Sequence, residues 1–199
     1  SLLGALPISI CKEASLSFKI TPKLYDIIDG KISVNQLREV QIEDLLGREV
    51  IKTNINSISE YLSHSVVLVT GAGGSIGSEL CRQVLRFNPK TLILLDHAEN
   101  NLYKIDLELT QIQTNTEIIP VIADVKNMLK LRYVFEKYQP QVVFHAAAYK
   151  HVPLMEYNIE EVIQNNILGT RNLLELSQKF KINEFVLIST DKAVKPTNC

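Results

Sequence analysis

The 199-residue chain is poor in cysteine, and this scarcity argues against two classes of structure. Its three cysteines are Cys11, Cys81 and Cys199, which lie far apart and form no C-x-x-C pair. Such spacing speaks against a disulfide framework and against a zinc site, and it fits a reducing compartment. We therefore expect a cytoplasmic protein without a metal centre.

The chain also lacks an excess of charge and a long apolar run. Its formal net charge is −1, so it carries no basic footprint for nucleic acid or for an anionic membrane. No apolar stretch approaches the ~18 residues of a membrane span. The first ten residues are apolar but lack the charged segment that opens a signal peptide. The remaining composition, 46% hydrophobic and 22% charged, is typical of a globular protein.

A strand, a glycine-rich turn and a helix follow one another between Val66 and Phe87, in the order of a dinucleotide-binding βαβ unit. Gly71 lets the chain leave the strand in a conformation closed to residues with a Cβ atom. Gly74 lets the backbone approach a pyrophosphate, and Gly77 lets the helix pack closely. The helix starts at Ser75 and Ile76, where free N–H groups and a partial positive charge favour phosphate.

An acidic residue ends the next apolar run. Asp96 lies 19 positions after Gly77, close to the ~20 expected for a carboxylate that binds the adenosine ribose. The alternative is that Asp96 only caps the following helix. We favour the ribose role, and an acid at this position would repel a 2′-phosphate. The sequence therefore predicts NAD rather than NADP.

From residue 65 onward, strands and helices alternate, which predicts an α/β fold with a doubly wound parallel sheet. The expected strands are Val66–Thr70, Thr91–Asp96, Glu117–Ile122, Val142–Ala146 and Phe185–Ser189. The expected helices are Ser75–Phe87, Asn100–Gln113, Lys126–Tyr138 and Asn166–Lys179. We interpret residues 65–199 as an incomplete NAD-binding domain of the Rossmann type.

Residues 1–64 are predicted to form a separate, smaller element. Leu16–Ile20 alternates like a short strand, Thr21–Pro22 starts a short helix that ends at Gly30, and Asn56–Leu62 forms a second helix. No catalytic constellation is visible in this region. We interpret it as the remnant of a preceding domain with a linker.

Small and polar residues follow the fourth strand, at the sheet edge where ligands bind. Ala146, Ala147 and Ala148 leave room for a flat cofactor ring, although close helix packing is an alternative. For His145 and His151, we favour a structural or substrate-contact role over catalysis, because they lack metal-ligand spacing.

Two further polar groups lie at this edge. Lys150 faces either a cofactor phosphate, a nucleotide substrate or only solvent. Thr190, Asp191 and Lys192 follow the fifth strand and present a hydroxyl, a carboxyl and an amine in succession. Such a set can orient a substrate hydroxyl and move protons, but it also fits a capping pair beside a surface lysine.

The combination of motifs resembles the extended short-chain dehydrogenase/reductases, and more narrowly the CapD-like nucleotide-sugar 4,6-dehydratases of bacterial polysaccharide biosynthesis. The segments that carry this resemblance are Leu37–Arg48, Thr70–Leu80, His145–Glu156, Asn166–Thr170 and Ser189–Val194. The first of these is typical of the large members, in which a transmembrane region and a further domain precede the catalytic domain. This implies a location at the cytoplasmic face of the inner membrane, with residues 1–36 as the end of that preceding domain.

The resemblance implies tightly held NAD, a UDP-N-acetylglucosamine type of substrate and a 4-keto-6-deoxy product. Asp191 would protonate the departing C6 hydroxyl, Lys192 would remove the C5 proton, and Thr190 would hold the C4 hydroxyl. Lys150 and His151 would contact substrate. The remaining roles implied are adenine contacts for Asp124 and Val125, and a bracing role for Asn166.

One departure from the family is the end of the chain at Cys199, before the motif in which a lysine binds the nicotinamide ribose. We therefore expect these 199 residues alone to bind NAD weakly or not at all, and to catalyse nothing. Two alternatives stay open: a nucleotide-sugar 4-epimerase or reductase, and a non-catalytic NAD-binding or oligomerisation module. Whether the chain forms a homo-oligomer is also open.

Overall fold

The computed structural model describes residues 19–20, 38–39 and 55–189, and the chain divides into two units, residues 1–53 and 54–199. In the first unit, β1 (Lys19–Ile20) pairs antiparallel with β2 (Arg38–Glu39). β1 falls within a predicted strand, whereas the sequence predicted no strand at β2. The helix expected between Thr21 and Gly30 lies outside the described residues.

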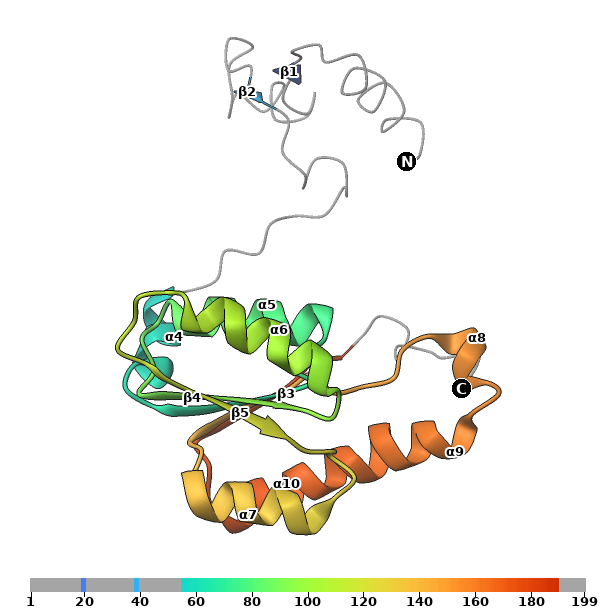
Figure 1. Cartoon of the computed structure of the whole chain (residues 1–199). Coiled ribbons are helices and arrows are strands. Elements are labelled where there is room, and N and C mark those ends of the chain that lie inside the picture. Colours follow the sequence, from blue (N-terminus) through green and yellow to red (C-terminus); the bar gives the residue numbers. More distant parts are fainter. Residues whose placement is uncertain (1–18, 21–37, 40–54, 190–199) are drawn as a thin grey trace, which may run out of the picture. The chain divides into compact units, whose positions relative to one another are not determined.

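Five parallel strands form the sheet of the second unit (Figure 1), in the order β5-β4-β3-β6-β7. They are β3 (Val66–Thr70), β4 (Thr91–Asp96), β5 (Glu117–Ile122), β6 (Val142–His145) and β7 (Glu184–Leu187). The chain starts at β3, runs outward to β5 and then crosses to β6 and β7. This reversal of direction is the doubly wound topology, so the predicted fold class is confirmed.

Helices cover both faces of the sheet (Figure 1). On one face lie α4 (Ile55–Leu62), α5 (Ser75–Leu85) and α6 (Glu99–Thr110), and on the other lie α7 (Met128–Tyr138) and α10 (Thr170–Lys179). All six residues of β4 are buried, as expected for a parallel strand covered on both sides. Alternate strand residues therefore enter two separate hydrophobic cores, with Leu92 and Leu94 in one and Ile93 and Leu95 in the other.

The segment between β6 and α10 differs most from the sequence prediction, which placed one helix from Asn166 to Lys179. The structure instead has α8 (Val152–Met155), α9 (Ile159–Val162) and the π-helical segment η1 (Ile163–Gly169), which leads directly into α10. A π turn admits an extra residue per turn, and such turns are frequent at functional sites. This one contains Asn165 and Asn166, which bond backbone groups of the segment that follows β6.

The contact between α5 and the glycine loop leaves no space for a side chain at Gly77. A Cβ atom there would overlap the carbonyl oxygen of Gly71, whereas one on Gly74 would lie 3.2 Å from that same oxygen. We expect Gly77→Ala to lower the free energy of unfolding by about 3 kcal/mol, because the backbone must move apart. Gly74→Ala is the matched control, with a much smaller loss. Urea unfolding of both variants gives the comparison, and equal losses would contradict it.

Candidate functional site

A pocket of about 220 Å³ lies at the carboxyl ends of the central strands, where a doubly wound sheet binds its ligands. Its lining includes these residues predicted from the sequence: Gly71, Gly74, Asp96, Val125, Ala146, Ala147 and Ala148. It also includes these residues that sequence reasoning missed: Leu95, His97, Ala98, Asn101, Ala123, Tyr149 and Asn165. The lining does not include the other predicted residues of the described part, which are Ser75, Ile76, Gly77, Asp124, Lys150, His151 and Asn166.

The glycine loop presents backbone to this pocket. Gly71 has φ +69°, the left-handed conformation predicted for it, and a Cβ atom there would lie 2.8 Å from the backbone of Ala146 and Ala147. Gly74 is extended and begins α5 without a side-chain cap. The first N–H groups of a helix have no partner within it, and Ser75 and Ile76 are exposed. Such groups suit a phosphate, and phosphate binding at this helix start stays a prediction.

The Asp96 carboxylate holds the glycine loop against the end of β4. It is 6% exposed, with Oδ2 accepting a hydrogen bond from the Gly73 amide (2.9 Å) and Oδ1 accepting one from the Ala98 amide (2.8 Å). Ala98 is the N-cap residue of α6, and this helix has no side-chain cap, so the bond from the Ala98 amide to Asp96 forms an Asx turn before the helix rather than the predicted cap. Because the same carboxylate lines the pocket, ribose binding stays a prediction for its remaining acceptor capacity.

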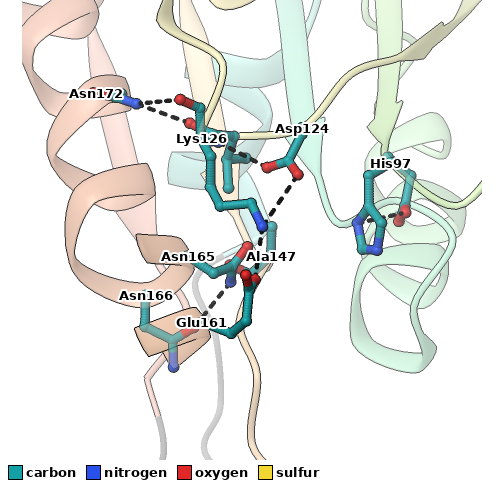
Figure 2. A network of polar contacts seen from close by, with 10 residues as sticks. His97, Asp124, Lys126, Ala147, Glu161, Asn165, Asn166 and Asn172 are labelled. Carbon is teal, nitrogen blue, oxygen red and sulfur yellow. Dashed lines mark hydrogen bonds and ion pairs between the residues drawn. The ribbon is translucent and has the colours of Figure 1, made fainter. Parts of the chain in front are cut away.

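Two asparagines of η1 hold the wall that follows β6. Asn166 accepts a hydrogen bond from the Tyr149 amide and donates one to the Tyr149 carbonyl, both at 2.9 Å. Asn165 donates to the Ala147 carbonyl (3.3 Å) and to the side-chain oxygen of Asn166 (2.9 Å) (Figure 2). These bonds satisfy backbone groups beyond the last residue of β6. Asn165 is buried and lines the pocket, and its place before Asn166 was the only sequence signal for it.

The loop between β5 and α7 forms the opposite wall. Asp124 Oδ1 accepts a hydrogen bond from the Lys126 amide (2.8 Å), and Asn172 donates to the carbonyls of Val125 (3.1 Å) and Lys126 (3.3 Å). Lys126 Nζ lies 2.8 Å from Glu161 Oε2 and 3.5 Å from Asp124 Oδ2 (Figure 2). The hydrogen bond to Glu161 is the main cause that raises the pKa of Lys126, with a further contribution from Asp124.

His145 has a structural role in this arrangement. Nδ1 lies 2.7 Å from Thr70 Oγ1, and Nε2 lies 2.8 Å from Thr170 Oγ1. Since the Thr170 hydroxyl donates to the Asn166 carbonyl, it must accept from Nε2–H, which leaves Nδ1 to accept from Thr70. A neutral imidazole satisfies every bond, and burial lowers the pKa of His145 to about 4.

The other polar residues predicted at this edge divide into two groups. Lys150 and His151 are exposed beyond the pocket, and the His151 side chain makes no capping bond to α8. Thr190, Asp191 and Lys192 lie outside the described residues. Their proposed catalytic roles therefore stay predictions.

Comparison with known proteins identifies the family of this chain. The model of the family described as "Polysaccharide biosynthesis protein" matches residues 67–199. The chain belongs to this family. It is 48% identical over 190 residues to the capsular polysaccharide biosynthesis protein CapD of Staphylococcus aureus, covering 95% of the chain and 32% of CapD. It is 47% identical over 193 residues to the probable polysaccharide biosynthesis protein EpsC of Bacillus subtilis, covering 94% and 32%.

The chain thus spans about a third of the length of these family members. Among solved structures, Pen from Bacillus thuringiensis is 30% identical with a TM-score of 0.64, covering 69% of the chain and 41% of Pen. The NAD-bound UDP-glucose 4-epimerase of Stenotrophomonas maltophila has a TM-score of 0.59 at 23% identity, covering 68% and 43%, and shows the fold alone. Among the residues described here, none of the helices is long and apolar enough to cross a bilayer.

Because His145 is buried in its neutral form, we expect the folded protein to lose stability in acid. Its pKa is about 4 when folded and 6.5 unfolded, so its contribution is complete above pH 6.5 and is lost as the pH falls towards 4. The loss at pH 4 should be about 3 kcal/mol. Urea unfolding between pH 7.5 and 4 measures it. His145→Gln should be less stable at pH 7.5 but should lose less on acidification, and parallel pH curves for the two proteins would contradict this account.

Proposed function

We propose that this chain carries the cofactor half of an NAD-dependent nucleotide-sugar 4,6-dehydratase of surface polysaccharide biosynthesis, acting on a UDP-N-acetylglucosamine type of substrate. The observation that carries the proposal is the Asp96 carboxylate, fixed at the end of β4 beside the glycine loop and facing the pocket. A carboxylate there can accept from ribose hydroxyls and repels a 2′-phosphate. This supports NAD over NADP.

The residues present fit a dinucleotide. The uncapped start of α5 offers N–H groups to the pyrophosphate, and the small side chains of Ala146, Ala147 and Ala148 leave space beside it for a flat ring. Val125 offers an apolar contact to the adenine from the opposite wall. NAD would take up a hydride from C4 of the sugar and return it at C6.

The proposed proton transfers fall to residues that follow β7 in sequence. β7 pairs with β6 along its whole length, with Leu187 opposite His145, so the described end of β7 lies beside the alanine wall. Thr190 would hold the C4 hydroxyl, Asp191 would protonate the departing C6 hydroxyl, and Lys192 would remove the C5 proton. A lysine must be neutral to act as a base, so its pKa must be lowered when substrate is bound.

Relatives support this reading at the level of the reaction class. The inverting UDP-N-acetylglucosamine 4,6-dehydratase of Campylobacter jejuni is 31% identical over 133 residues, covering 66% of the chain and 38% of that protein. UDP-glucose 4-epimerase of Rickettsia rickettsii is 32% identical over 136 residues, covering 66% and 38%. Identity therefore does not separate dehydratase from epimerase. The succession Thr190-Asp191-Lys192 favours the dehydratase, because epimerisation needs no acid for a leaving C6 hydroxyl.

The remaining parts of the proposal concern location and partner. We propose that the whole protein works at the cytoplasmic face of the membrane, where nucleotide sugars are supplied, and that its substrate partner is a UDP-sugar.

Replacing Asp191 with Asn separates the dehydratase from the epimerase. In a chain extended to the length of its relatives, the variant should still oxidise C4 and form some NADH, but it should lose the elimination of water by at least a hundredfold, as expected on removal of a general acid. Absorbance at the NADH band and mass spectrometry of the sugar product measure the two steps. Unchanged dehydration would exclude the assigned role, and an unaltered protein that inverts C4 without losing water would favour the epimerase.

A further inference from the structure

Lys126 stands between two carboxylates that come from different parts of the chain. Its ammonium lies 2.8 Å from Glu161 on α9 and 3.5 Å from Asp124 on the β5–α7 loop (Figure 2). We propose that the Lys126–Glu161 ion pair positions Asp124 beside the pocket wall that Ala123 and Val125 form, and thereby sets the preference of the pocket for an adenine base. This inference rests on the proposed function, because it assumes that the pocket binds a purine nucleotide.

The Asp124 carboxylate is held by Lys126 at both oxygens. Oδ1 accepts the Lys126 amide at 2.8 Å, and Oδ2 faces the ammonium of the same residue at 3.5 Å. The longer of these contacts leaves Oδ2 acceptor capacity for a ligand. Asp124 is partly exposed, and its neighbours Ala123 and Val125 both line the pocket. The carboxylate thus lies next to the pocket wall, and the proposal requires that it reach a bound base from the edge of that wall.

An ionised carboxylate only accepts hydrogen bonds, so it distinguishes between purines. Adenine offers an amino group at its sixth position, which can donate to Asp124. Hypoxanthine has a carbonyl oxygen at that position, which would face the carboxylate without a proton between them. An Asp124 side chain held in place therefore weakens the binding of a hypoxanthine nucleotide. A mobile Asp124 side chain can turn towards solvent, so it weakens that binding less.

Glu161 connects this loop to the opposite wall. It belongs to α9, which continues into η1, and the η1 residues Asn165 and Asn166 hold the backbone of Ala147 and Tyr149. Lys126 thus anchors Asp124 to the same helical segment that shapes the alanine wall. The backbone of the loop has separate support from Asn172, which bonds the carbonyls of Val125 and Lys126. Loss of the ion pair should therefore move the Asp124 side chain without unfolding the loop.

The Lys126–Glu161 ion pair contributes little to the stability of the fold. The Lys126 and Glu161 side chains are 28% and 53% exposed. Exposed pairs of this kind contribute little to the free energy of unfolding, since water screens them. If the ion pair positions Asp124, its removal changes the preference for adenine over hypoxanthine. If it only stabilises the fold, its removal leaves that preference unchanged.

The test compares adenosine and inosine monophosphate, which differ only in the base. Lys126→Met and Glu161→Gln each remove the ion pair, and Glu175→Gln is the matched control because it removes the exposed Arg171–Glu175 pair of α10. Titrations followed by NMR detect weak binding. We expect the unaltered chain to prefer adenosine monophosphate by about tenfold, as for one well-placed hydrogen bond, and the ratio to fall at least threefold in both variants. The control ratio and all midpoints of thermal unfolding should be unchanged within about 2 °C.

A second measurement needs no ligand. Amide hydrogen exchange of Glu161→Gln should show at least threefold lower protection of the Lys126 amide, which donates to Asp124, with no change in Glu175→Gln. A variant that keeps both the base preference and this protection would overturn the inference. If the unaltered chain bound neither nucleotide, the proposed cofactor site would fail, and the exchange result alone would decide whether the ion pair anchors Asp124.

Discussion

Three backbone segments meet at Gly71 without room for a side chain. On one side the helix α5 approaches so closely that a Cβ atom on Gly77 would overlap the Gly71 carbonyl oxygen. On the other side a Cβ atom on Gly71 itself would lie 2.8 Å from the backbone of Ala146 and Ala147. This close approach places Gly74, the N-cap residue of α5, in the pocket lining and sets the alanine wall beside it.

Side-chain amides and carboxylates hold the loops that follow the strands of the sheet. Asp96 ties the glycine loop to the start of α6, Asn166 satisfies both backbone groups of Tyr149, and Asn172 holds the loop after β5. These bonds fix loops that would otherwise leave partly buried backbone groups without partners. His145 belongs to the same system, since it joins Thr70 of β3 to Thr170 of α10. The pocket is thus organised by short-range polar contacts around a rigid apolar sheet.

The sequence predicted the central sheet well because its signal is local. The bounds of β3, β4 and β5 are those predicted, since each strand is a short run rich in apolar residues next to a turn. The glycine spacing likewise predicted the left-handed Gly71. The π turn of η1 was missed, because an extra residue in a helical turn breaks the period that such predictions use. Asn165 and the Lys126–Glu161 pair were missed because their partners lie 18 and 35 positions away.

The central claim is that the carboxyl end of this sheet binds the adenosine half of NAD. The most direct measurement is an NMR titration of the isotope-labelled chain with NAD, with NADP as the matched comparison. The account predicts that the largest amide shifts fall on Gly73, Gly74, Ser75 and Ala98, and that NADP produces the same shifts only at higher concentration. Largest shifts in the groove at the other end of the sheet, lined by His64, Asn88 and Lys90, or tighter binding of NADP, would contradict it.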